Sequence, residues 1–388
     1  MGKGALGALA AYWPEDTARY AHVPLKRVGD LTLHATALSA AERPALISAA
    51  GSASYGQIAA DVKRLAAALR GRLQKGARVA VGLEDPAELI TSLFACFETE
   101  MLAHASAGAI DARLAELFGA DVVIGGSGDK GVSYAALGAE AGSDKVDRPD
   151  FKKPLVAFAK PDRSGETVHN HKTLAATAIA MGSFFMIDGE TQVLLAEPPT
   201  DWLSLSMLLA TWHKGGTVWA GWEGVSAKLP ERVDYLVTSW QTAMERHLEG
   251  PPRIPRMRIG AGALVGVEHG FSVARRRRLA RRLGAPVLTV LGRSDLGPLL
   301  ASHPTWFLDD AVGIPLPNVD TRPLNPADGT PLNIGWDAVE SAELGVKSAQ
   351  APAGGTLVAE NWIRTGLVAE IDPTGLYFLH DLTPTGTL

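Results

Sequence analysis

The chain has 388 residues, of which 46% are hydrophobic and 20% are charged, so it can form one large α/β unit or two to three subdomains. Its formal net charge of −5 argues against nucleic acid and against an anionic membrane surface as partners. Cys96 is the only cysteine and lies in an apolar run, which excludes an intrachain disulfide and predicts a buried structural thiol. No apolar run approaches the ~18 residues of a membrane helix, and we expect a cytoplasmic protein.

The first 150 residues alternate between predicted strands and helices. Residues 44–54 have the pattern of a hairpin. Ser54 is a candidate N-cap for a helix over 55–72, in which apolar residues fall at helical spacing. A strand over 78–83 follows, and then a helix that opens at Pro86. This alternation predicts a parallel sheet covered by helices.

The alternation continues after residue 190 and changes near residue 312. The small residues 260–263 predict a loop after a short strand, and LGRSDLG (291–297) predicts a second loop. From about residue 312, short strands separated by Pro and Gly turns indicate an antiparallel β subdomain. The other expected strands are 192–196, 217–220, 235–239, 257–259 and 286–290, and the other expected helices are 204–212, 241–248 and an arginine-rich helix that contains residues 275–282.

The central stretch, residues 154–174, has the layout of a phosphate-binding loop. A short apolar strand over 155–158 precedes a loop over 159–165, and a helical pattern begins near Lys172. The loop has one glycine, however, and its cations are Lys160 and Arg163 alone, while nearby acidic residues (Asp162 and Glu166) would repel phosphate. The stretch therefore has the position of a phosphate loop without its usual chemistry.

Several ordered motifs resemble those of the adenylate-forming enzymes, a superfamily that includes acyl-CoA synthetases, peptide-synthetase adenylation domains and luciferases. The matching stretches run from about Thr32 to Leu382 and comprise Tyr55-Gly-Gln-Ile with RLAAAL, Lys75-Gly-Ala-Arg-Val-Ala-Val, Val168-His169-Asn170-His171, LGRSDLG, Val312-Gly-Ile-Pro-Leu-Pro-Asn-Val and Trp362-Ile-Arg-Thr-Gly. The resemblance implies the large N-terminal domain of that fold, with α/β subdomains at 1–150 and 151–311 and a distorted antiparallel β-barrel at 312–388. The small C-terminal lid would begin where the sequence ends, and we expect it to be absent.

The resemblance also implies site residues. Asp295 stands where the family holds Mg²⁺ with a Glu, although a role as a simple loop cap is an equal alternative. No catalytic residue is assigned, because the family's catalytic lysine belongs to the lid. The implied nucleotide-binding residues are Gly260, Ala261, Gly262, Leu291, Gly292, Arg293, Ser294, Asp295 and Arg364, and the implied substrate-pocket residues are Asp201, Trp202, Ser239 and Trp240.

Departures from the family pattern predict a repurposed site. Leu367 replaces the acidic residue that bonds the ribose hydroxyls, and Leu291 replaces the aromatic that stacks on adenine. The phosphate loop is degenerate, and the lid is expected to be missing. We therefore favour a protein that binds an acyl, acyl-CoA or acyl-adenylate ligand, or a partner protein, without standard adenylation. An active acyl- or aryl-acid ligase that uses ATP and Mg²⁺ with a lid in trans stays open, as do coenzyme A as a ligand and a dimeric scaffold.

For two further clusters we favour a structural or surface role over a binding site. His169 and His171 precede a helix, where structural capping or surface placement is favoured over metal binding. The arginines between residues 275 and 282 favour a solvated helix face over a site for the phosphates of coenzyme A.

Overall fold

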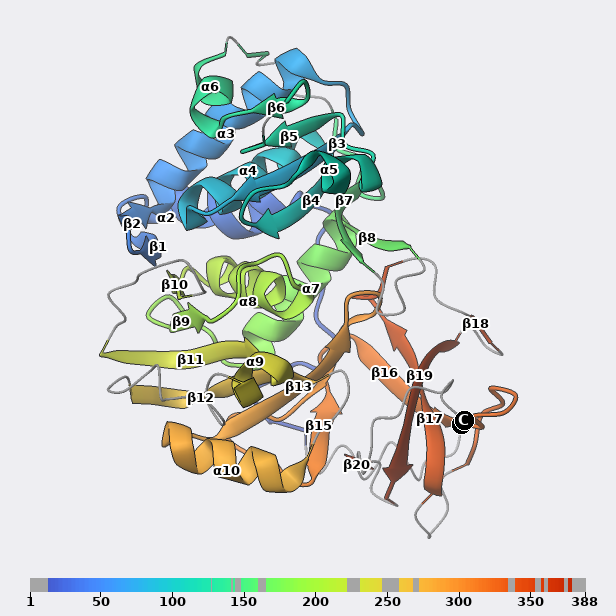
Figure 1. The fold of residues 1–388 in the computed structure, drawn as a ribbon. Helices are drawn as coiled ribbons and strands as arrows, with labels where there is room; N and C mark the ends of the chain where they lie inside the picture. Colours follow the sequence, from blue (N-terminus) through green and yellow to red (C-terminus); the bar gives the residue numbers. More distant parts are fainter. Residues whose placement is uncertain are drawn as a thin grey trace. The chain divides into compact units, whose positions relative to one another are not determined.

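The computed structural model describes two compact units (Figure 1). The first unit comprises residues 23–182 and 187–229, and the second comprises residues 1–22, 183–186 and 230–388. The described residues are 13–126, 128–140, 142–143, 148–159, 165–221, 231–245, 258–267, 272–333, 339–352, 357–358, 362–372 and 376–378. Within those ranges, no helix combines the length and the apolar character needed to cross a membrane. The division at residues 150 and 311 stays a prediction.

A six-stranded sheet forms one part of the first unit, with the strands in the order β6-β5-β3-β4-β7-β8. All its neighbours are parallel except β7 and β8, which form an antiparallel hairpin. Its strands are β3 (Arg78–Leu83), β4 (Leu102–Ala107), β5 (Val122–Ile124), β6 (Gly131–Val132), β7 (Pro154–Ala159) and β8 (Glu166–Asn170), and the helices between them in sequence are α4 (Pro86–Thr99), α5 (Ala112–Leu117) and α6 (Tyr134–Ala139). This confirms the predicted parallel sheet and the predicted bounds of β3 and α4.

Helix α4 carries Cys96 on its buried side. The thiol is fully buried, and burial raises its pKa to about 12. A thiol with that pKa is protonated at neutral pH and is a poor nucleophile. The prediction of a buried structural thiol is confirmed.

Four further strands of the first unit pair in the order β9-β10-β1-β2. Trp212 is fully buried, and its ring centroid lies 5.0 Å from that of Phe94. Its indole nitrogen donates a hydrogen bond of 3.0 Å to the carbonyl of Ala45. This side chain therefore connects three segments of the unit through one core position. The elements are β1 (Pro44–Ser48), β2 (Gly51–Ser54), α3 (Tyr55–Arg72), α7 (His171–Phe184), β9 (Gln192–Leu195), α8 (Trp202–His213) and β10 (Thr217–Ala220), preceded by a π-helical turn, η1 (Asp30–His34), and α2 (Ala35–Ser39).

Helix α3 begins where its sequence predicts. The Ser54 hydroxyl accepts a hydrogen bond of 3.3 Å from the Gln57 backbone N–H, and the Gln57 side chain accepts one of 2.8 Å from the Ser54 N–H. These two bonds form a capping box, which satisfies two backbone donors that the helix cannot pair internally. The predicted hairpin, N-cap and helix over 55–72 are all confirmed.

The second unit combines a parallel and an antiparallel part. Strands β11, β12 and β13 are parallel, and β14 and the following strands are antiparallel. This confirms the predicted change to antiparallel pairing. The elements are β11 (Arg232–Ser239), α9 (Trp240–Thr242), β12 (Arg258–Val267), α10 (Val273–Leu283), β13 (Val287–Arg293), β14 (Gly297–Ala301), β15 (Ala311–Pro315), β16 (Val319–Leu324), β17 (Val339–Ser348), β18 (Leu357–Val358), β19 (Trp362–Ile371) and β20 (Tyr377–Phe378).

The arginine-rich helix α10 has one buried arginine among exposed ones. Arg276 is only 1% exposed, whereas Arg275, Arg277 and Arg278 are exposed. Its guanidinium donates to the carbonyls of Val287, Leu308, Asp309 and Ala311 and to the Ser302 hydroxyl. The predicted solvated face is thus confirmed for most arginines of α10. It is wrong for Arg276, which binds α10 to the strands that contain Val287 and Ala311. Burial lowers the pKa of Arg276 to about 10, and the group is still charged at neutral pH.

We expect Arg276→Ala to lower the free energy of unfolding by roughly 3 kcal/mol or more, because several buried acceptors would lose their donor at once. Chemical denaturation measures the change. Arg278→Ala is the matched control, since it removes an exposed arginine from the same helix and should stay within about 0.5 kcal/mol of the parent. Equal effects of the two substitutions would contradict the anchoring role.

Candidate functional site

The central stretch forms a β-hairpin: the strands on the two sides of its loop, β7 and β8, pair with each other. Residues 160–164, including Lys160, Asp162, Arg163 and Ser164, lie outside the described residues. The predicted layout of strand, loop and helix needs a correction, because β8 lies between the loop and α7 and pairs antiparallel with β7. Burial alternates along β8, with Thr167 and His169 buried, but the residue types of ETVHN do not alternate, so this strand has no periodic signal in the sequence.

Glu166, the first residue of β8, is bound by a neighbouring cation. Its two carboxylate oxygens accept from Nη2 of Arg78 at 2.9 and 2.7 Å. The same Nη2 donates to Nε2 of His104 at 2.8 Å, so the proton of the neutral ring lies on Nδ1, which is 3.4 Å from Glu166. Burial lowers the pKa of His104 to about 4, and the ring is neutral at pH 7. These contacts connect β8 to β3 and β4, and they occupy Nη2 of Arg78 with partners inside the protein.

Both histidines of the VHNH motif are buried, so surface placement is wrong for them. His171 is 0% exposed, and its Nδ1 accepts a hydrogen bond of 3.1 Å from the Val28 backbone N–H. Burial lowers the pKa of His171 to about 4, which keeps the ring neutral and Nδ1 available as an acceptor. The predicted structural role of His171 is therefore confirmed by its hydrogen bond with the Val28 N–H.

Gly260, Ala261 and Gly262 lie within strand β12, so the predicted loop is wrong. The strand register pairs Tyr235 with Gly262 and Val267 with Leu291. Five residues of extended chain separate Gly262 from Val267, which corresponds to about 17 Å. The structure therefore does not bring these three residues to the Leu291 end of β13. Small residues favoured a loop in the sequence, although glycine and alanine also fit where strands pack closely.

The segment from Leu291 to Asp295 ends β13 and turns into β14. Leu291, Gly292 and Ser294 are buried, and Arg293 pairs with Gly297 across the turn. The Asp295 carboxylate accepts two hydrogen bonds from the guanidinium of Arg293, at 2.9 and 2.8 Å. Arg293 also donates from Nη1 to the Thr365 carbonyl at 2.6 Å. A bidentate pair of this kind is both strong and geometrically specific.

Arg364 lies on β19 and is paired with Glu343 of β17. Its Nε donates to Oε2 of Glu343 at 2.7 Å, and its Nη2 contacts the same oxygen and the Pro326 carbonyl. Glu343 is only 1% exposed, and its Oε1 accepts from the Gly366 N–H at 2.8 Å. The buried charge is thus satisfied from both sides. Glu343 has no distinct signal in the sequence, because its strand also contains Glu340 and Lys347.

The structure therefore brings one part of the predicted nucleotide site together. Arg293 binds the carbonyl of Thr365, the residue next to Arg364 on β19, and this contact joins the Asp295 pair to the Glu343 pair. Leu367 follows two residues later and is 4% exposed, so an apolar side chain is packed at the position where the resemblance implies a ribose-binding acid.

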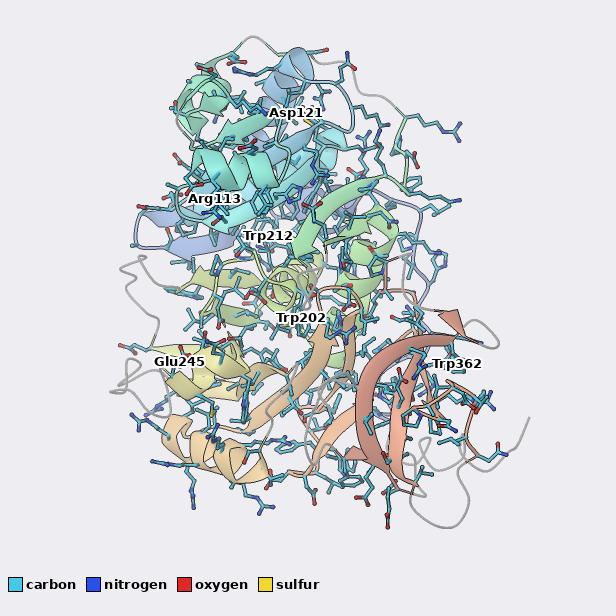
Figure 2. The ribbon with its side chains drawn as sticks, turned by 45° about the vertical axis from the view of Figure 1, so that its right-hand side comes forward. Arg113, Asp121, Trp202, Trp212, Glu245 and Trp362 are labelled. Carbon is cyan, nitrogen blue, oxygen red and sulfur yellow. The ribbon has the colours of Figure 1, made fainter. Side chains whose placement is uncertain are left out.

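Asp201 caps helix α8 and precedes Trp202, which Figure 2 labels together with Trp212 of the same helix. The Asp201 carboxylate accepts from the backbone N–H groups of Leu203 at 2.9 Å and Ser204 at 3.2 Å. Burial and the nearby charge of Glu197 raise the pKa of Asp201 to about 6. Trp202 is buried in the first unit, and the role of both residues in a substrate pocket stays a prediction.

Ser239 and Trp240, in the second unit, make a second helix start. The Ser239 hydroxyl accepts a hydrogen bond of 3.1 Å from the Thr242 N–H and so caps α9, whose first residue, Trp240, is buried. Both predicted pocket pairs therefore consist of a cap and a buried tryptophan, and capping accounts for the Ser239 hydroxyl and for Oδ1 of Asp201.

Comparison with known proteins agrees with the fold. A family model described as AMP-binding enzyme matches residues 33–112. Three acyl-CoA synthetases are similar in structure. ATP-bound MatB from Rhodopseudomonas palustris is 18% identical, with 90% of this chain and 78% of that chain covered and a TM-score of 0.73. A double mutant of o-succinylbenzoate CoA synthetase (MenE) from Bacillus subtilis is 17% identical, with 89% and 77% covered and a TM-score of 0.74.

The third, a benzoate CoA ligase from Burkholderia xenovorans, is 17% identical, with 91% of this chain and 79% of that chain covered and a TM-score of 0.73. No curated protein sequence matches. The predicted resemblance to the adenylate-forming enzymes is confirmed in fold, and the chain has the architecture of their N-terminal domain.

We expect Asp295→Ala to lower the free energy of unfolding by about 1–3 kcal/mol, because it removes a partly buried bidentate partner of Arg293. Thermal or chemical denaturation measures the loss. Asp309→Ala is the matched control, since it breaks an exposed pair with Arg277 in the same unit and should cost at most about 1 kcal/mol. A loss no larger than that of the control would show that the Arg293 pair is not structural.

We also expect Asp201→Asn to change how stability depends on pH. The folded state keeps the Asp201 proton up to a pKa of about 6, whereas the ordinary value is 3.8, so the free energy of unfolding falls as pH rises between these values. Asn caps helices as well as Asp does but cannot ionise, so the variant should lack this fall and be more stable than the parent above pH 6. Denaturation at a series of pH values tests this. Asp111→Asn, at the exposed N-cap of α5, should leave the profile unchanged, and parallel profiles for Asp201→Asn and the parent would contradict the shift.

Proposed function

We propose, from the N-terminal acyl-CoA synthetase fold of this chain, that it binds an acyl, acyl-CoA or acyl-adenylate ligand in the ancestral site and does not carry out standard ATP-dependent adenylation. The observation that carries the proposal is the state of Asp295. Both of its oxygens accept from Arg293, so a Mg²⁺ ion would have to displace a bidentate guanidinium.

The ribose side of the site supports the same proposal. Leu367 is buried and cannot accept a hydroxyl hydrogen bond. The nearest carboxylate along the sheet, Glu343, is bonded to Arg364 and to the Gly366 N–H. A nucleotide ribose would leave its hydroxyls unpaired there, at about 1–3 kcal/mol for each group.

On the phosphate side, Arg78 binds Glu166, the first residue of β8 after the loop. Arg78 is committed to Glu166 and His104, so it is a poor partner for an incoming phosphate. An acyl or pantetheine-like ligand needs less charge compensation than a triphosphate. Coenzyme A stays among the candidate ligands with its uncharged pantetheine arm in the site, because its own phosphates need as much charge compensation as a triphosphate.

An active acyl- or aryl-acid ligase is the alternative, using ATP and Mg²⁺ with a lid supplied in trans. It is favoured by the AMP-binding family model and by the likeness to ATP-bound MatB. A partner protein in place of a small ligand, a homodimer and a cytoplasmic location also stay predictions.

Pyrophosphate exchange distinguishes the two functions. The full chain is incubated with ATP, Mg²⁺, labelled pyrophosphate and a panel of aryl, alkyl and dicarboxylic acids. We expect exchange at background level with every acid, because the metal and ribose positions are occupied by internal pairs. Acid-dependent exchange that Asp295→Ala abolishes and Asp309→Ala retains would overturn the proposal in favour of the ligase.

Thermal-shift measurements with ATP, AMP, coenzyme A and acyl-CoAs identify the ligand class. A ligand at about 100 times its dissociation constant adds about 2.7 kcal/mol to stability. We expect a shift with an acyl-containing ligand and none with ATP and Mg²⁺. The absence of a shift with every compound would favour a scaffold and reject ligand binding.

A further inference from the structure

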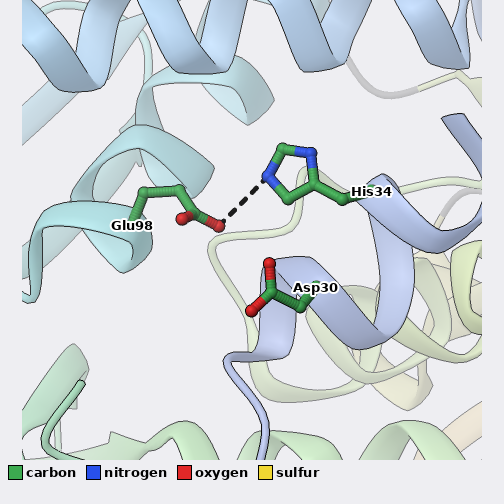
Figure 3. Close-up of side chains that lie close together, drawn as sticks. All are labelled: Asp30, His34 and Glu98. Atoms are coloured by element: carbon green, nitrogen blue, oxygen red, sulfur yellow. Dashed lines mark hydrogen bonds and ion pairs between the residues drawn. The ribbon is translucent and has the colours of Figure 1, made fainter. Parts of the chain in front are cut away.

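Three side chains with metal-binding atoms meet in the first unit, apart from the predicted nucleotide and substrate residues (Figure 3). Asp30 and His34 lie four residues apart on the π-helical turn η1, so both project from one face of it. Glu98 comes from α4. One nitrogen or oxygen atom from each side chain lies within 4.8 Å of the atoms of the other two.

The closest pair in this cluster has the spacing of two ligands on one ion. Nε2 of His34 is 3.2 Å from Oε1 of Glu98. Tetrahedral ligands at ~2.0–2.1 Å from a zinc ion stand ~3.3–3.4 Å apart, so both atoms could bind one ion after small side-chain adjustments. In Figure 3 the Asp30 carboxylate approaches the same space from the η1 side.

The position of Glu98 is built into the surrounding structure. Its second oxygen, Oε2, is 3.6 Å from Nη1 of Arg27, which leaves Oε1 directed to His34. Gly29 provides the room, because a Cβ on this residue would lie 2.2 Å from Oε1. The backbone of Gly29 is helical (φ −60°, ψ −42°), so its conformation does not require glycine and the space for the carboxylate does.

A cavity of about 720 Å³ opens beside the cluster. His34 and Glu98 line it, so an ion bound between them would have a coordination position facing open space, as catalytic and exchangeable metal sites do. Small side chains and cations form the remaining wall and could receive a water or a small anion. The cations of this wall are Arg27, Lys63 and Arg70.

The charges of the cluster also favour a cation. One oxygen of Asp30 and one oxygen of Glu98 lie within 4.8 Å of each other, so two like charges stand close together. Arg27 lies on the far oxygen of Glu98 and compensates only part of this charge. A divalent ion between the carboxylates would relieve the remaining repulsion.

We propose that Asp30, His34 and Glu98 bind one divalent transition-metal ion of the zinc class, with its remaining coordination position open to the cavity. One imidazole and two carboxylates suit Zn²⁺ or Co²⁺ better than Mg²⁺ or Ca²⁺, which prefer oxygen ligands alone. Arg27 is a positioning residue that holds the Glu98 carboxylate, and Gly29 keeps the space for it. The site is independent of the ligand proposed above.

Titration of the EDTA-treated full chain with Co²⁺ tests the proposal, because Co²⁺ reports its coordination by visible absorption. We expect saturable binding of one ion per chain, displacement by Zn²⁺ and no competition from Mg²⁺. His34→Ala and Glu98→Gln should each weaken binding at least about tenfold, since even outer-shell changes at metal sites cost ~10–100-fold. His22→Ala, which removes an exposed histidine outside the cluster, should leave affinity unchanged.

Gly29→Ala is the sharpest variant, because it keeps all three ligands and only displaces the Glu98 carboxylate. We expect it also to weaken Co²⁺ binding at least about tenfold, with the fold verified by circular dichroism and by thermal denaturation in EDTA. Absence of saturable Co²⁺ binding in the parent would overturn the proposal. So would retention of parental affinity in His34→Ala, Glu98→Gln and Gly29→Ala, or an equal loss in His22→Ala.

Discussion

The bidentate pair between Arg293 and Asp295 determines how the second unit can use its predicted nucleotide residues. It closes the turn between β13 and β14, and the third nitrogen of the same guanidinium binds the carbonyl of Thr365 on β19. The strand next to β19 contributes Glu343, which binds Arg364 and the Gly366 N–H. Two ion pairs and one backbone contact therefore stabilise this part of the sheet, and three of the paired side chains (Arg293, Asp295 and Arg364) are ones that the sequence predicts for a nucleotide and its metal.

Elsewhere the fold depends on single polar side chains that reach distant backbone groups. Arg276 serves four carbonyls, Trp212 binds the Ala45 carbonyl, and His171 accepts from the Val28 N–H. Each of these groups is buried, so each bond removes a desolvation cost that the core would otherwise carry. The same logic applies to Glu166, whose charge is compensated by Arg78.

Local signals made much of the fold predictable. Ser54 with Gln57 three residues later, and Pro86 at the first helical position, are read correctly because capping depends on neighbours in sequence. The wrong predictions concern residues whose structure depends on partners far away in sequence. Gly260 to Gly262 lie inside β12 because the segments on either side of them pair with β11, and Gly262 itself pairs with Tyr235; the composition of the segment does not contain that information.

Most contacts of the predicted nucleotide residues join positions far apart in sequence, so the sequence alone does not predict them. Nothing near Asp295 in sequence separates a metal ligand from a partner of Arg293, and Glu343 becomes meaningful only beside β19. The cluster of Asp30, His34 and Glu98 joins residues of two separate helices, so its spacing in sequence carries no metal signal. Motif order predicted the family fold, while the contacts of individual side chains decide what the site can bind.

The most direct measurement is a crystal structure of the full chain grown with saturating ATP and Mg²⁺. The account predicts that Asp295 keeps both hydrogen bonds to Arg293 and that no metal ion lies beside it. An Asp295 carboxylate oxygen at ~2.0–2.1 Å from a Mg²⁺ ion, with the Arg293 pair broken and nucleotide phosphates on that ion, would contradict it.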